Sequence, residues 1–541
     1  MSHHMRPLEA AFADELRAAR PDLVRGFTES LPGARAAVLA RLWRALLFEQ
    51  GLTAAVPAAE RARLSGPRLR PYDVGAPARG LTVCLGGRPF DHPAGLLSAL
   101  RVPGSAGLVA ELDHSVASLA LSRADAAGDS RADAAGGGAD TLVEHEQSVV
   151  DGHPYHPCCR SRPGFTVTDQ LAYAPEHRRP VDLGLVAVRR ADAVVVGDWP
   201  GGLCEGGRIL IPAHPWQLRT VLPGLGFGAT GEALPAHPLM AVRTLAPLDG
   251  GPHLKTALSL RMTSAVRDIS GESVLNSAPL SALLEQVCGR LGGTLLITRN
   301  LAAASALVDG GPSRDLAVLV RESPEVHAGP GERVVPLAAL AEHPGRLGDP
   351  AGWLRSFAEL AWTPLLRLLG WGVALEAHGQ NLLVVLDRRQ RPLRLVYRDL
   401  ADVRVSRRRL EAHGIRPPAL DVLGGHVLED DPVALRRKLF GSLLGGTFSA
   451  LVSALGRGDR DREDGLWQLV AAAAGPAARE VLGPDDRRAL LCEPVPVKAL
   501  TLMRLAGRPP GDLWTPLSNP LAAATGSDQA VSRPSEKLGE K

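Results

Sequence analysis

The chain has 541 residues, 45% of them hydrophobic and 22% charged, with a formal net charge of +3. This length exceeds one ordinary hydrophobic core, so we expect two or three lobes of a soluble globular protein. The near-neutral charge gives no support for a nucleic-acid partner, and no apolar run of about 18 residues indicates a membrane span. Without an apolar signal core or paired cysteine spacing, we expect a cytoplasmic protein with free thiols.

Lysine is scarce among the basic residues. The 61 Lys and Arg residues include five lysines: Lys255, Lys438, Lys498, Lys537 and Lys541. Arginine does not reproduce the compact point charge of an ammonium group, so a lysine kept inside a patterned segment indicates a need for that charge. Chance remains the alternative for any single lysine.

Residues 1–140 are expected to form a mainly helical region. Apolar residues recur at helical spacing in 10–27 and 34–50. The segment 123–140 repeats RADAAG and ends in glycines. This composition predicts a low-complexity surface loop at the end of the region.

Residues 141–350 mix short strands, loops and helices. Residues 254–262, LKTALSLRM, alternate in the manner of a strand, 280–291 have helical periodicity, and 294–298 form a short apolar strand. We therefore expect a central domain over 141–350.

The last part, 351–541, begins with the amphipathic helix 353–370, which ends at a glycine. An apolar strand at 382–386, a polar turn and a second strand at 393–399 then predict a β-hairpin. Further helices follow, and the overall class is α+β.

Polar residues stand at both outer ends of this hairpin. Folding it should bring Asn381 close to Asp399, near Glu376, His378 and Gln380. Carboxylate and amide oxygens suit Mg²⁺ held together with nucleotide phosphates, and protein kinases place an Asn and an Asp in the same way. An ordinary hairpin with polar ends is the alternative.

A second group of residues is cationic. Lys255 lies in the strand at 254–262, and Thr263, Ser264 and Arg267 follow it. Upstream, residues 240–245 add Arg243 and Thr244. These groups suit phosphate or carboxylate and predict an anionic small-molecule ligand, with solvated strand ends as the alternative.

The segment GHPYHPCCRSRPGF, 152–165, contains two His-Pro steps followed by arginines. Proline excludes helical geometry in the residue before it, so His153, His156 and, further on, His214 are expected on stiff, extended backbone. Zinc is not favoured, because the two histidines are not a helical i, i+4 pair. Contact with a polyanionic substrate suits these histidines, Arg160 and Arg162 better, although structural histidines remain the alternative.

Six motifs in this order resemble the IucA/IucC family, the siderophore synthetases that work without a nonribosomal peptide synthetase (NIS synthetases). They are GHPxHP with basic residues and GF, PxHPWQ, RT, K-x₇-TS-x₂-R, ExHxQN and RD, between about residues 143 and 405. The resemblance implies a cupped hand of three subdomains. These would be a thumb-like region (1–140), a fingers-like acid- and ATP-binding domain (141–350) and an FhuF-like, distantly kinase-like palm (351–541).

The resemblance also implies an activity. ATP and Mg²⁺ would activate a carboxylate, commonly citrate, as an acyl-adenylate, and an amine or hydroxyl would then displace AMP. By motif, the catalytic residues would be His156, Lys255 and Arg267; the acid-binding residues His153, Arg160, Arg162, His214 and Gln217; the ATP-binding residues Arg243, Thr244, Lys255, Thr263, Ser264, Arg267, His378, Gln380 and Asn381; and the metal-binding residues Glu376, Asn381 and Asp399. We further expect His156 to accept the proton of an attacking amine. The partners would be small molecules, and a homodimer stays open.

The chain departs from the family pattern at two positions. Arg160 stands where lysine is usual, and Ala241 stands where a serine hydroxyl often precedes the RT motif. Two rival hypotheses therefore remain: a kinase-like phosphotransferase, which would produce ADP, and a binder of an anionic metabolite without catalysis.

Overall fold

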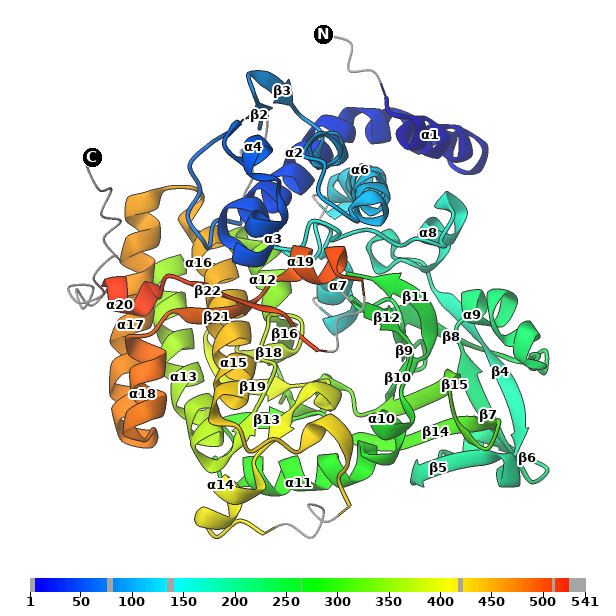
Figure 1. Cartoon of the computed structure of the whole chain (residues 1–541). Helices are drawn as coiled ribbons and strands as arrows, with labels where there is room; N and C mark the ends of the chain where they lie inside the picture. The colour runs from blue at the N-terminus through cyan, green and yellow to red at the C-terminus, as the bar shows by residue number, and fades with distance from the viewer. Residues whose placement is uncertain are drawn as a thin grey trace.

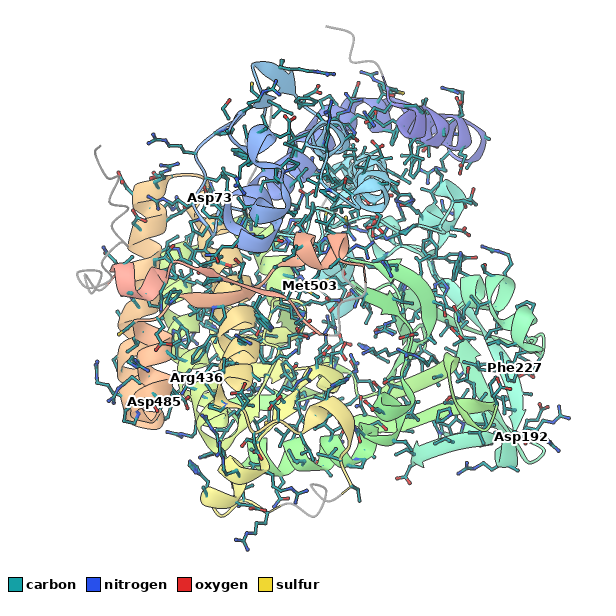
Figure 2. All side chains as sticks on the ribbon, viewed as in Figure 1. Asp73, Asp192, Phe227, Arg436, Asp485 and Met503 are labelled. Carbon is teal, nitrogen blue, oxygen red and sulfur yellow. The ribbon has the colours of Figure 1, made fainter. Side chains whose placement is uncertain are left out.

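The computed structural model describes residues 5–74, 81–133, 141–263, 265–416, 422–507 and 511–524. Three regions surround the centre of the molecule: N-terminal helices, a large antiparallel sheet, and C-terminal helices around a smaller sheet (Figure 1). Figure 2 shows side chains of all three regions on this arrangement of helices and strands. The α+β class is confirmed.

The N-terminal region is a helical bundle with a small sheet. Helix α1 ends before Pro21, and α2 begins at Val24, so the periodic segment 10–27 forms two helices. Helix α6 continues to Asp133, so residues 123–133 are helical and the expectation of a loop there was wrong; alanine in the repeat favours helix. Residues 134–140 lie outside the described residues. The elements are α1 (Pro7–Ala19), α2 (Val24–Phe48), α3 (Gln50–Ala55), α4 (Ala58–Arg61), β1 (Leu64–Ser65), β2 (Val83–Leu85), β3 (Arg88–Phe90), α5 (Pro93–Ala99) and α6 (Ala106–Asp133).

A nine-stranded antiparallel sheet forms the central region, with strand order β5-β14-β15-β10-β9-β8-β4-β7-β6. Lys255 on β10 pairs with Thr244 on β9 and Leu319 on β15, so it lies in the middle of the sheet. The strands are β4 (Val181–Arg189), β5 (Ala193–Gly197), β6 (Cys204–Glu205), β7 (Arg208–Ala213), β8 (Ala233–Pro238), β9 (Thr244–Pro247), β10 (His253–Thr256), β14 (Asn300–Val308) and β15 (Gly311–Arg321).

The strand expected at 254–262 is two strands. It divides at Ala257: β10 stays in the large sheet, and β11 (Leu258–Met262) leaves it to pair with β12 (Ala265–Arg267). The short ribbon of β11 and β12 carries Arg267 back toward Lys255. Helices α7 (Leu142–Gln147), α8 (Val167–Tyr173), α9 (Pro215–Thr220), α10 (Gly271–Leu275) and α11 (Ser277–Gly289) complete the region.

The predicted hairpin is confirmed as β18 and β19, with Leu382 opposite Tyr397. It lies in a four-stranded sheet of order β13-β19-β18-β16. Helix α13 ends at Trp371 and is capped by Gly372, whose φ of 105° suits glycine; this cap lies two residues beyond the expected stop. The elements are β13 (Leu295–Ile297), β16 (Arg333–Pro336), α12 (Leu337–Glu342), α13 (Pro350–Trp371), β17 (Val373–Ala374), β18 (Leu382–Leu386), β19 (Pro392–Tyr397), β20 (Arg404–Val405), α14 (Arg407–Ala412), α15 (Pro432–Ser442), α16 (Ser449–Gly456), α17 (Arg460–Val481), α18 (Pro484–Leu491), β21 (Val495–Lys498), α19 (Leu500–Leu505), β22 (Trp514–Leu517) and α20 (Pro520–Ala524).

The largest hydrophobic core crosses residue 350. Leu283 of α11 and Leu295 of β13 belong to the same buried cluster as Trp362 and Phe448 of the C-terminal region. Within the described chain, one helical stretch, Pro432–Gly456, is long and apolar enough to span a membrane, but 67% of its apolar window is buried inside the fold. This burial is typical of a core helix in a soluble protein.

Candidate active site

An ion pair joins the central sheet to the C-terminal hairpin. Asp399 follows β19 in a left-handed conformation with φ of 69°. Its Oδ1 accepts hydrogen bonds from Lys255 Nζ at 2.6 Å and from Arg321 Nη2 at 3.3 Å. Lys255 and Arg321 are each only 4% exposed. The expected convergence of the cationic segment and the hairpin is therefore confirmed.

Asp399 is ionised in this setting. Burial by itself raises the pKa of the carboxyl, but the positive charges of Lys255 and Arg321 outweigh burial and hold that pKa well below its ordinary value. Burial is also the largest effect on Lys255 and lowers its pKa from 10.5 to about 8, against the attraction of Asp399. At neutral pH both groups carry charge.

This ion pair lies in the wall of a cavity of ≈ 280 Å³. Carboxylates and apolar side chains share the wall, but basic groups predominate among its charges. The basic residues are Arg243, Lys255, Arg267, Arg314, Arg321 and Arg404. The acidic residues are Asp268, Glu272, Asp399 and Asp402. A small polyanion fits this charge balance.

Arg243 and Arg267 are held by the turn around the β11–β12 ribbon. Arg243 Nη1 donates to the carbonyl oxygens of Arg267 and Asp268, both at 2.6 Å. Arg267 Nη2 donates to Thr263 Oγ1 at 2.6 Å. Arg243 thus fastens the backbone that presents Arg267, and both guanidinium groups retain further donors. Ser264 lies outside the described residues.

A smaller hollow adjoins the cavity at Asp399 and Arg321. Asn381, Gln380, Thr244 and Ala241 line it. The main-chain N–H of Arg398 donates to the carbonyl oxygen of Asn381 at 3.0 Å, which closes the base of the hairpin. The predicted proximity of Asn381 to Asp399 is thereby confirmed, and the methyl of Ala241 stands where a hydroxyl would face the same hollow.

The His-Pro steps form one repeated turn. In each, the imidazole Nδ1 accepts the main-chain N–H two residues later. His153 accepts from Tyr155 at 3.2 Å, and His156 from Cys158 at 2.9 Å. The intervening proline has no N–H to compete and keeps the histidine extended. His378, which precedes a glycine, accepts from Gln380 at 3.3 Å in the same way.

This turn decides what His156 can do. A neutral imidazole that accepts at Nδ1 carries its hydrogen on Nε2. Burial, reinforced by the nearby charge of Arg267, lowers the pKa of His156 to about 3, so the ring is neutral. Its Nε2 is buried without a hydrogen-bond partner. His156 is therefore a hydrogen-bond donor, and the expectation that it accepts an amine proton was wrong.

Glu376 is engaged by two lysines. Lys498 Nζ lies 2.6 Å from Glu376 Oε1, and Lys438 Nζ lies 3.5 Å from the same atom. Burial raises the pKa of Glu376, but the two ammonium groups outweigh it and hold that pKa well below its ordinary value. The structure thus places Glu376 in an ion pair, and its assignment as a metal ligand stays a prediction.

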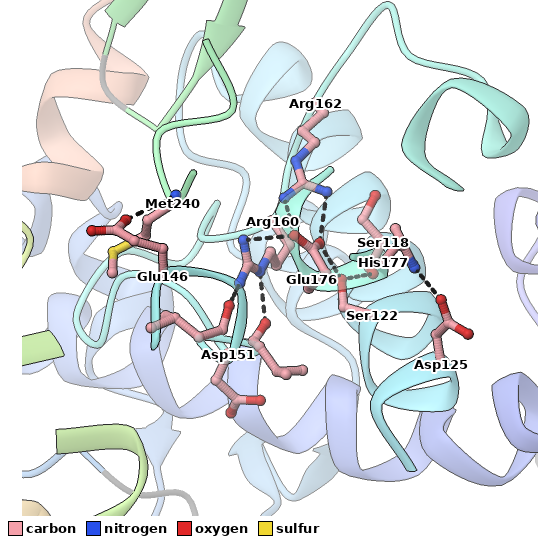
Figure 3. Close-up of polar contacts among 12 residues, drawn as sticks. Ser118, Ser122, Asp125, Glu146, Asp151, Arg160, Arg162, Glu176, His177 and Met240 are labelled. Atoms are coloured by element: carbon pink, nitrogen blue, oxygen red, sulfur yellow. Dashed lines mark hydrogen bonds and ion pairs between the residues drawn. The ribbon is translucent and has the colours of Figure 1, made fainter. Parts of the chain in front are cut away.

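Arg160 and Arg162 do not line the cavity, and Figure 3 shows both guanidinium groups directed at Glu176. Arg162 forms a two-pronged pair with Glu176 at 2.8 and 3.0 Å. Arg160 Nη1 lies 3.5 Å from the same carboxylate, and its Nε donates to the carbonyl oxygen of Val150 at 2.7 Å. These contacts occupy donors of both arginines, and the expectation that they bind substrate stays a prediction.

His214 and Gln217 have structural contacts. His214 caps α9 by accepting the N–H of Trp216 at 3.2 Å, and its ring packs 4.9 Å from that of Tyr173. The Gln217 amide joins Ser259 and Asp315 through contacts of 2.8 and 2.9 Å. Neither lines the cavity, and their assignment to substrate binding stays a prediction.

The sequence reasoning missed several charged groups. Arg321 ends an apolar strand, and this position, a charge at the end of a buried strand, is the signal that could have identified it. Lys438 and Lys498 were noticed only through the scarcity of lysine. All three lysines within the described residues contact carboxylates in or beside the candidate site.

Comparison with known proteins identifies two matched regions in this chain. Residues 141–342 match the model of the IucA / IucC family, and residues 351–512 match that of the ferric iron reductase FhuF-like transporter. The chain is 24% identical over 434 residues to staphyloferrin A synthase of Staphylococcus aureus, covering 71% of this chain and 73% of that protein.

Solved structures share the fold over most of the chain. The petrobactin biosynthesis protein AsbB of Bacillus anthracis aligns with a TM-score of 0.75 at 19% identity, covering 94% of this chain and 98% of that one. ATP-bound aerobactin synthetase IucA of Klebsiella pneumoniae aligns with a TM-score of 0.69 at 20% identity, covering 85% and 92%. The chain therefore carries an IucA/IucC family domain followed by an FhuF-like domain, and it is similar to the synthases and biosynthesis proteins named above.

Proposed function

We propose that this protein is an ATP-dependent ligase of siderophore biosynthesis that works in the cytoplasm. It adenylates a polycarboxylic acid such as citrate and condenses the activated acyl group with an amine or hydroxyl, with release of AMP and pyrophosphate. The observation that carries this proposal is the contact of Lys255 with Asp399 inside a cavity lined by further arginines. The matched IucA/IucC family domain and the similarity to siderophore synthases support it.

The charge of the cavity matches the main barrier to this reaction. A carboxylate and a nucleoside triphosphate repel each other, and at about 4 Å one pair of unit charges is worth roughly 4 kcal/mol near a protein surface. Lys255, Arg243, Arg267 and Arg321 offset this repulsion where the two anions meet. Because these groups are already in place, they also stabilise charge that builds up at phosphorus.

In the first step an oxygen of the acid attacks the α-phosphorus and pyrophosphate leaves. In the second, the nucleophile attacks the acyl carbon, its proton passes to solvent, and the bond from the acyl carbon to the phosphate oxygen breaks to release AMP. Lys255 and Arg267 orient the two acidic groups, and His156 donates its Nε2–H to an oxygen of the acid or the phosphate. Gln380, Asn381 and Thr244 line the adjoining hollow and hold the nucleotide.

The residues present fit one Mg²⁺ held mainly by the nucleotide. Among the described residues, no group of three His, Cys, Asp or Glu side chains could hold a metal. Mg²⁺ is commonly held by one or two carboxylates together with substrate phosphates, and the ionised Asp399 with Asn381 meets that need. When bound, the ion would neutralise phosphate charge, and the experiment on Glu376 described below tests whether this carboxylate is a further ligand.

The direct test is release of pyrophosphate by the purified protein with ATP and Mg²⁺. Citrate, α-ketoglutarate and succinylated amines would each be supplied with and without a polyamine, and mass spectrometry would identify the products. We expect AMP and pyrophosphate to form only when an acid is present. Acid-dependent formation of ADP would instead establish a phosphotransferase, and no turnover with any acid would favour a binder without catalysis.

A further inference from the structure

We propose that Lys498 is a positioning residue of the active site: its ammonium fixes Glu376, and with it the loop 376–381. The inference rests on the proposed function, because the loop carries His378, Gln380 and Asn381. Lys498 belongs to the C-terminal segment 495–517, which consists of β21, α19 and β22. This C-terminal segment therefore contributes to the active site.

The contacts of Lys498 are close and directed. Its Nζ lies 2.6 Å from Glu376 Oε1 and 3.1 Å from Asp512 Oδ2. The Glu376 side chain is only 10% exposed. The second ammonium, that of Lys438, is 3.5 Å from Glu376 and has no hydrogen-bond partner. Lys498 thus makes the direct bond, and Lys438 adds charge at longer range.

Glu376 is in turn bonded to the loop that it begins. Its carbonyl oxygen accepts from Asn381 Nδ2 at 3.3 Å, and its N–H donates to the Tyr397 hydroxyl at 3.2 Å. Tyr397 is two residues from Asp399, whose carbonyl oxygen its hydroxyl contacts at 3.4 Å. A displacement of Glu376 therefore reaches both ends of the hairpin.

The segment that delivers Lys498 is docked on the N-terminal region. The N–H groups of Thr501 and Leu502 donate to the carboxylate of Glu49 at 3.1 and 2.8 Å. Thr515 Oγ1 donates to the carbonyl oxygen of Phe48 at 3.0 Å. Figure 1 shows α19 beside α3, so the segment that carries Lys498 is held by the N-terminal region.

Removing one charge or both charges of the pair distinguishes this role of Glu376 from metal binding. Removing one member of a buried ion pair leaves an uncompensated charge, whereas removing both is often tolerated. If Glu376 serves as the partner of Lys498, neutralising both should restore much of what either single change removes. If Glu376 binds the metal, the double variant should be no better than Glu376→Gln.

The experiment compares Lys498→Met, Glu376→Gln and the double variant with the full-length protein. Condensation would be measured well below every melting temperature, together with Mg²⁺-dependent affinity for α,β-methylene-ATP, which needs no turnover. We expect each single variant to lose at least about 10-fold in kcat/KM and the double variant to return to within about 5-fold of the unmodified protein. Lys498→Arg should retain more activity than Lys498→Met.

Three outcomes would overturn the inference. The first is a double variant whose kcat/KM is no better than that of the worse single variant. The second is analogue binding that loses its Mg²⁺ dependence in every variant lacking Glu376. The third is an unchanged kcat/KM in Lys498→Met despite a lower melting temperature. Arg367→Met, which breaks a surface pair with Glu480, is the matched control and should leave kcat/KM unchanged. The unmodified protein could show no condensation while the affinity for the ATP analogue still falls in each single variant and recovers in the double variant. In that case the proposed function fails and the positioning role stands.

Discussion

Two clusters of buried charge in this molecule have similar composition and different uses. Around Asp399, Lys255 and Arg321 share one carboxylate at the wall of a cavity. Around Glu176, Arg160 and Arg162 also share one carboxylate, but Ser122 and main-chain carbonyl groups take up further polar atoms there. Basic residues close together thus do not identify a binding site; donors that face open volume do.

The largest expected effect comes from a substitution in the cavity wall, at Asp399, compared with one outside the cavity. Asp399→Asn removes the charge that holds Lys255 and Arg321 and that would face the metal, so kcat should fall by about 1,000-fold or more. Pyrophosphate release and circular dichroism would be measured together. Asp387→Asn, at the opposite end of the same hairpin, is the control and should stay within about twofold. A loss smaller than tenfold in Asp399→Asn would remove Asp399 from the mechanism.

A substitution in the buried cluster around Glu176 should change the free energy of unfolding. Glu176→Gln leaves Arg160 and Arg162 without their counter-charge and should lower the free energy of unfolding by about 3 kcal/mol, measured in urea. At low temperature the folded variant should keep its KM for the acid. A KM raised more than tenfold with unchanged stability would mean that these arginines bind substrate after all.

Substitutions of His156 test whether the His-Pro turn makes this imidazole a hydrogen-bond donor in the reaction. A glutamine amide can replace the donating Nε2–H, so His156→Gln should lose about tenfold in kcat/KM and His156→Ala about 100-fold. Neither change should move the pH profile, because the imidazole is neutral throughout. Equal losses in both variants, with the acid limb of the profile abolished, would restore the proton-accepting role.

The smallest effect concerns Glu342, which holds the His-Pro segment by accepting the N–H groups of Val150 and Asp151 at 2.8 and 2.6 Å. Burial, with repulsion from Asp151, raises the pKa of Glu342 from 4.5 to about 7. The folded state then binds the proton more tightly, so stability falls as pH rises from 4.5 to 7. Melting temperatures at pH 5 and 8 should show this fall, and Glu342→Gln should reduce it. An equal fall in both proteins would exclude Glu342 as its source.

Some of this molecule follows from short stretches of chain. Alternation and turn residues predicted the hairpin, and its closure placed Asn381 beside Asp399 without any distant contact. The scarcity of lysine correctly drew attention to Lys255. The His-Pro steps fixed extended backbone locally, because proline restricts the residue before it.

Other features were settled only by contacts between distant segments. Lys255 and Asp399 are 144 positions apart, and Lys498 and Glu376 are 122 apart. The same arginine side chain binds a carboxylate inside the fold or faces a cavity according to which distant element packs against it, as Arg162 and Arg243 show. Sequence alone determined which residues carry charge and which backbone is stiff; the tertiary structure decided which charges are neutralised, because neutralisation depends on a partner from elsewhere in the chain.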